Sequence, residues 1–140
     1  PYLGALPLPD DRGAMKHFLE ALTWHTDHGD CIMIYPEAHI WPFYTGIRPF
    51  PDTSFRCPVQ QKLPVFCLTN TYQRREKSHI PQIVTYLDGP FYPNAELSAK
   101  LQKTQLRDQV YEAMGKRAQN SNMEMICYIK KDTDREKSFI

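Results

Sequence analysis

The run "CIMIY", residues 31–35, decides the fold class that the sequence predicts. It is continuously apolar instead of alternating, which is typical of a strand covered on both faces in a parallel sheet. The stretch "LPVFCLTNTY", residues 63–72, repeats this signature. A third stretch, "PQIVTYLDGPFYP", predicts another strand, with a turn at Asp88 and Gly89. Residues 3–12, "LGALPLPDDR", predict a short strand that leads into a loop.

Two segments have the periodicity of helices. Apolar residues at i, i+3, i+4 and i+7 mark one helical face near the start of the chain, at Met15, Phe18, Leu19 and Leu22. A second face lies between residues 98 and 117, at Leu106, Val110, Ala113 and Met114. The alternation of strands and helices predicts an α/β fold with a mostly parallel mixed sheet flanked by helices.

Composition limits the classes of function. The chain has 140 residues, 17 Lys and Arg against 16 Asp and Glu, and a formal charge of +1, so no overall field would recruit nucleic acid. Its apolar runs are far shorter than the ~20 residues of a membrane-spanning helix, so any membrane contact is expected to be peripheral. The four cysteines have no C-x-x-C spacing and are expected to be reduced, as in a cytosolic protein.

The candidate binding residues follow the first predicted strand. In α/β sheets, ligands gather outside the carboxyl ends of strands, where Pro36, Glu37, Ala38 and His39 stand. Glu37 can accept hydrogen bonds from hydroxyls or brace an arginine, and Arg48 in the following loop can bind phosphate oxygens. The alternative is that Glu37 caps the loop and His39 is merely solvated.

The stretch "IMIYPEAHIWP" resembles the Pro-Glu-Gly motif of the lysophosphatidic acid acyltransferase family, the glycerophospholipid acyltransferases. Three other stretches resemble further family motifs in the same order. These are "LGALPLPDDR", which ends in the position of a substrate-binding arginine, here Arg12, then "KLPVFCLTN" and "TYLDGPFYP". The resemblance spans roughly residues 3 to 118.

The resemblance implies one acyltransferase domain, incomplete at its N-terminus, with a family-like core at 1–118 and a C-terminal strand or tail at 119–140. It implies transfer of a fatty acyl group from acyl-CoA or acyl carrier protein to a lysophospholipid or glycerophosphate hydroxyl, in phospholipid synthesis, without a cofactor. It also implies a cytoplasmic protein peripheral to the inner face of a membrane. The implied substrate-binding residues are Arg12, Glu37, Ala38, His39 and Arg48.

The motif differs from the family pattern in four places. Tyr35 replaces Phe, Ala38 replaces Gly, and His39 and Ile40 stand where Thr and Arg would be. We therefore expect Arg12 or Arg48 to supply the phosphate contact of the missing motif arginine.

The family's catalytic pair is a His and an Asp separated by four residues, placed before the substrate-binding arginine. His25 and Asp30 match that spacing but lie after Arg12, where a polar turn between helix and strand also explains them. We expect the genuine pair to lie upstream of Pro1, so that this chain supplies acceptor binding without the base. Two alternatives are a non-catalytic lipid-headgroup module and a metal-dependent hydrolase, with ligands among His25, Asp27, His28 and Asp30.

The aromatic residues after the motif have two interpretations. They could line an acyl groove or touch the bilayer interface, where Trp and Tyr are favoured, or they could simply pack against the sheet. These residues are Trp41, Phe43, Tyr44, Phe50 and Phe55.

Overall fold

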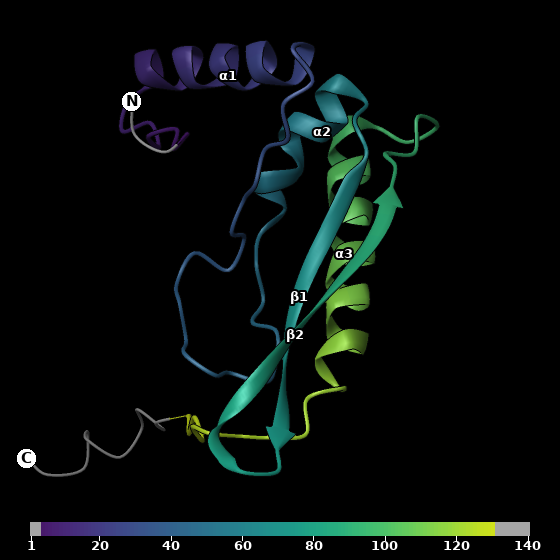
Figure 1. Ribbon diagram of the computed structural model, residues 1–140. Helices are drawn as coiled ribbons and strands as arrows, with labels where there is room; N and C mark the ends of the chain where they lie inside the picture. The colour runs from purple at the N-terminus through teal and green to yellow at the C-terminus, as the bar shows by residue number, and fades with distance from the viewer. Residues whose placement is uncertain (1–3, 131–140) are drawn as a thin grey trace, which may run out of the picture.

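The computed structural model describes residues 4–130, in which one long hairpin is covered on one face by a helix (Figure 1). The elements, in chain order, are α1 (Arg12–Asp27), the 3-10 helix η1 (Asp52–Phe55), α2 (Arg56–Gln61), β1 (Val65–Arg75), β2 (Ser78–Phe91) and α3 (Ala99–Ala118). None of the helices in this part of the chain is both long and apolar enough to cross a membrane.

The sheet has two strands, and they are antiparallel. β1 pairs with β2 in a register that sets Leu68 opposite Leu87 and Tyr72 opposite Ile83. The prediction of a mostly parallel mixed sheet flanked by helices is therefore wrong. Only residues 76 and 77 separate the strands, and parallel neighbours would need a crossover of a dozen residues or more.

The continuous apolar run in β1 predicted a strand covered on both faces, but one face of the hairpin is covered and the other is open. Cys67, Thr69 and Thr71 are buried beneath α3. Phe66 and Leu68 point to the opposite face, where 53% and 49% of their surfaces are exposed. The strand thus alternates in burial although its sequence does not alternate in polarity.

Two predicted strands do not form. Residues 31–35 and residues 4–9 lie outside helices and strands, and no ladder hydrogen bonds join either segment to the hairpin. Residues 119–130 also form no strand, whereas residues 1–3 and 131–140 of the predicted terminal segments lie outside the described residues. A strand requires a paired neighbour, which local sequence does not specify.

The predicted turn at Asp88 and Gly89 is also wrong, because both residues lie within β2. The register shifts between Val65 and Cys67, opposite this point. Gly89 has φ +129°, and a Cβ added there would lie 2.8 Å from the carbonyl oxygen of Val65. Glycine is required here because a side chain would collide with backbone across the hairpin.

Both predicted helices are confirmed. α1 begins after Asp11, whose carboxylate accepts a 2.7 Å hydrogen bond from the Ala14 N–H. Its buried residue, Leu22, lies on the face that meets α2. α3 lies lengthwise along the hairpin (Figure 1) and closes the core. The buried residues of that core are Phe50, Phe55, Val59, Cys67, Leu106, Val110 and Met114.

Candidate functional site

The loop that carries the Pro-Glu motif is closed on itself by Arg48. The Arg48 backbone N–H donates a 3.0 Å hydrogen bond to Oε2 of Glu37, and Nε lies 3.4 Å from the same oxygen. The guanidinium also donates to the carbonyl oxygen of Glu37 at 2.7 Å and to that of His39. Side chain and backbone of Arg48 therefore fix both the carboxylate and the chain that follows it.

These contacts of Arg48 with Glu37 and His39 form a clamp, which is partly buried. The side chains of Arg48 and Glu37 are 16% and 26% exposed, and the Arg48 guanidinium lies 4.6 Å from the centroid of the Trp41 ring. Charge-assisted bonds are strongest where water is scarce, and guanidinium stacks well on an aromatic face. Arg48 thus braces the loop, and an acceptor phosphate would have to compete with these contacts.

Ala38 and His39 form the tip of the loop. Ala38 has φ +63°, a left-handed conformation that glycine adopts at no cost. The His39 N–H donates a 2.8 Å hydrogen bond to the Glu37 carbonyl, while its side chain is exposed. The clamp therefore presents the His39 imidazole to solvent and holds the neighbouring carboxylate inward.

Part of the aromatic run anchors the loop, and part belongs to the core. Trp41 stacks on Tyr128 at 4.9 Å between centroids, and the Tyr128 hydroxyl donates a 2.9 Å bond to the Pro42 carbonyl. Phe50 and Phe55 are buried core residues. They therefore cannot line an exposed acyl groove.

Phe43 joins the loop to the hairpin through Tyr72, with ring centroids 5.6 Å apart. Burial raises the pKa of Tyr72, and the nearby Tyr128 and Glu37 raise it further. The clamp, β1 and the segment around Tyr128 therefore form one packed region.

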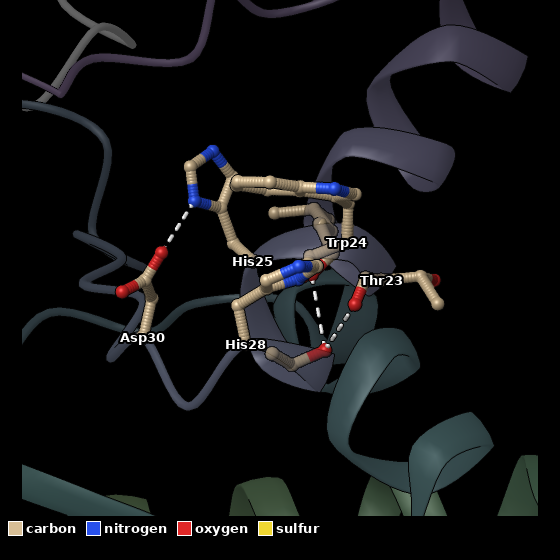
Figure 2. Close-up of polar contacts among 7 residues, drawn as sticks. Thr23, Trp24, His25, His28 and Asp30 are labelled. Carbon is tan, nitrogen blue, oxygen red and sulfur yellow. Dashed lines mark hydrogen bonds and ion pairs between the residues drawn. The ribbon is translucent and has the colours of Figure 1, made fainter.

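His25 and Asp30 are in contact at the end of α1. Nδ1 of His25 lies 2.8 Å from Oδ2 of Asp30, and the ring of Trp24 packs edge-on against His25 at 5.0 Å (Figure 2). An Nδ1–H held by a carboxylate leaves Nε2 as the free basic atom, the orientation that general-base histidines use. Both side chains are substantially exposed.

The way α1 ends explains this contact. The Asp30 N–H donates to the His25 carbonyl and the Gly29 N–H to the Thr26 carbonyl, with Gly29 left-handed at φ +81°. These two bonds define a Schellman motif, which brings residues five apart together at a helix C-terminus. The spacing that resembles the family's catalytic pair is therefore also the spacing of a helix cap.

The other residues predicted to bind a substrate or a metal ion do not gather at one site. Arg12 is the first residue of α1, is exposed, and makes no described hydrogen bond or ion pair with the Glu37 loop. His28 stacks on Trp24 at 4.0 Å and bonds the Trp24 carbonyl through Nδ1. Within residues 4–130, no three His, Cys, Asp or Glu side chains are arranged to hold a metal ion.

One ion pair was missed from the sequence. Arg117 binds both carboxylate oxygens of Asp88, with its closest contact at 2.7 Å, and its guanidinium lies 4.7 Å from the ring centroid of Tyr86. The hydrogen bonds from Arg117 hold the pKa of Asp88 below its ordinary value. No local pattern pairs these residues, because they are 29 positions apart and meet only after α3 folds onto the hairpin.

Comparisons with known proteins identify no relative: no family model, no curated protein and no solved structure matches the chain.

Proposed function

We propose that this chain binds the acceptor of a lysophospholipid acyltransferase, in which a fatty acyl group moves from acyl-CoA or acyl carrier protein to a glycerophosphate-type hydroxyl. The observation that carries the proposal is the closed loop from Glu37 to Arg48. It fixes a carboxylate beside an exposed imidazole, in the stretch that resembles the family's Pro-Glu-Gly motif. The left-handed Ala38 supports it, because that motif has glycine at this position.

Each residue has a role in this proposal. His39 is exposed and contacts the acceptor phosphate, whereas Glu37 accepts a hydrogen bond from a glycerol hydroxyl through its second oxygen. Arg48 and Ala38 hold the loop in the conformation that presents them. The exposed side chains of Tyr35, Ile40 and Trp41 face the membrane interface, so the protein is peripheral to a cytoplasmic membrane face.

The reaction needs a general base. The base takes the acceptor hydroxyl proton, the oxygen attacks the thioester carbon, and the thiolate leaves and is protonated. His25 has the orientation of such a base, since Asp30 occupies its Nδ1 side. The acceptor-binding role of the Glu37 loop does not depend on this assignment.

A second candidate function is a lipid-headgroup binding module without catalysis. The observation that favours it is that no described contact joins the His25–Asp30 pair to the loop clamped by Arg48. A base must lie within hydrogen-bonding reach of the hydroxyl that it deprotonates.

One experiment separates the two. The purified chain is mixed with lysophosphatidic acid vesicles and an acyl-CoA, thiol release and acylated product are measured, and vesicle binding is measured in parallel. Acyl transfer that is lost in His25→Ala and retained in His17→Ala, an exposed histidine on the same helix, supports the enzyme with His25 as its base. Binding without transfer overturns His25 as the base and supports a headgroup-binding role for this chain.

The acceptor site is tested with Glu37→Gln and Arg48→Ala. Both variants are expected to bind lysophosphatidic acid vesicles more weakly than the parent does. Binding to vesicles of the neutral diacyl lipid alone serves as the reference. If both bind as well as the parent, the proposed acceptor site is wrong. If the parent binds both kinds of vesicle equally well and transfers no acyl group, both proposed functions are wrong.

A further inference from the structure

The two edges of the hairpin differ. The outer edge of β1 is covered at one end, where the Tyr72 carbonyl accepts hydrogen bonds from the N–H groups of Asn122 and Met123, and the Arg74 N–H donates to Asn122. β2 has no comparable cover, since among residues 4–130 it pairs with β1 alone. β2 therefore presents an edge that lacks the cover found at Tyr72 and Arg74 on β1.

The register identifies the unpaired backbone groups. In antiparallel sheets, directly opposite residues point their N–H and C=O groups either toward each other or both outward. Tyr72 points outward, as its bond to Asn122 shows, so its partner Ile83 does too. Because the pattern alternates, Thr85 and Leu87 also point their backbone groups to this edge of β2.

Between residues 83 and 87 this edge carries no proline and no charged residue, and Pro81 stands in β2 just before this stretch. Ile83 and Leu87 are 55% and 64% exposed, and Thr85 between them is exposed and uncharged. Natural edges are usually protected by a lysine, a proline or an inward-pointing charge, which these three positions lack. An edge of this kind is a template for another strand.

The space beside the edge is open. A groove of about 520 Å³ runs between β2 and α3, bounded by Asp88 on the strand and by Gln109, Glu112, Lys116 and Arg117 on the helix. Its charged side chains are two acids and two bases, so their formal charges cancel. A surface with balanced charges can face its own copy without net repulsion, whereas a surface of one sign cannot.

We propose that two copies of the chain associate through β2, forming a continuous four-stranded sheet in the order β1-β2-β2-β1. An antiparallel two-fold arrangement centred on Thr85 places Ile83 of each copy opposite Leu87 of the other and Thr85 opposite itself. All three outward-facing residues then exchange both backbone hydrogen bonds, and the cross-strand pairs are apolar–apolar and Thr–Thr, which are favourable combinations. The edge is thus self-complementary, as a two-fold interface must be.

Residue 85 gives a specific test because Thr85 of one copy lies opposite Thr85 of the other at the two-fold axis. Sedimentation velocity of the parent is expected to show a monomer–dimer equilibrium. Thr85→Lys and Thr85→Glu should each weaken the dimer by at least about tenfold, since like charges would lie directly opposite. An equimolar mixture of the two variants should recover dimers, because Lys then faces Glu.

The control is Leu68→Lys, which adds the same charge to the same exposed face but on β1. It should dimerise like the parent. A parent that stays monomeric overturns the proposal, as does a Lys–Glu mixture that stays monomeric. Association that Leu68→Lys abolishes as fully as Thr85→Lys overturns it in favour of contacts across the open sheet face. Circular dichroism spectra of all variants confirm that each is folded.

Discussion

Two threonines of β1 provide a matched test of how the hairpin packs under α3. Thr69 and Thr71 are 1% and 0% exposed and lie two positions apart on the same face. The Thr71 hydroxyl donates a 3.0 Å hydrogen bond to the Val84 carbonyl and accepts one from the Gln73 amide. The Thr69 hydroxyl has no hydrogen-bond partner among the described residues.

Replacing each threonine by valine keeps its shape and removes its hydroxyl. A buried polar group without a partner costs about 1–3 kcal/mol, so Thr69→Val is expected to stabilise the fold by about 1 kcal/mol or more. Thr71→Val is expected to destabilise it by about 1 kcal/mol, because one hydrogen bond is lost and the Gln73 amide loses an acceptor. The same chemical change should therefore have opposite signs at the two positions.

Urea unfolding measures both effects. With a slope of about 2 kcal/mol per molar urea, a change of 1 kcal/mol moves the midpoint by about 0.5 M. The midpoint of Thr69→Val should rise and that of Thr71→Val should fall, each with an unchanged slope. If Thr69→Val lowers the midpoint as much as Thr71→Val does, then the Thr69 hydroxyl has a hydrogen-bond partner in solution. That result would refute the packing argument.

Three further predictions follow from close contacts. Gly89→Ala should destabilise the fold by about 2–3 kcal/mol in the same urea assay, because its Cβ would meet the Val65 carbonyl at a φ that only glycine readily adopts. Arg48→Ala should speed amide hydrogen exchange across residues 37–48 with little change in the urea midpoint, whereas the exposed Arg56→Ala should change neither. The folded-state pKa of Asp88 is depressed, so the stability it confers is complete above the ordinary Asp pKa and is lost as pH falls through the lower folded value. Thermal melting below about pH 4 should show this loss, and Asp88→Asn should reduce it.

Local periodicity predicted the elements whose form depends on local sequence. The apolar face near Leu22 specified α1, and the face at Leu106 and Val110 specified α3. The β-rich stretches specified β1 and β2 as strands. A strand's neighbours and the number of its covered faces are set by the rest of the chain, so the predicted parallel sheet failed at that step.

The candidate site also combines features that local sequence predicts with features that depend on the rest of the chain. The Pro-Glu stretch was identified from sequence, but the clamp was not, because it depends on the left-handed residues Ala38 and Phe43 that turn the loop back toward Arg48. The contact between His25 and Asp30 could have been predicted locally, since Gly29 after an amphipathic helix indicates a cap.

The two tryptophans divide the intrinsic fluorescence of the molecule between two separate regions. Trp24 lies against His28 at the end of α1, and Trp41 lies beneath Arg48 and against Tyr128. Ligand binding at the clamped loop should therefore perturb the emission of Trp41 and leave that of Trp24 almost unchanged. Trp24→Phe and Trp41→Phe isolate the two signals, so this protein carries its own optical reporters for the loop and for the helix, and needs no added dye.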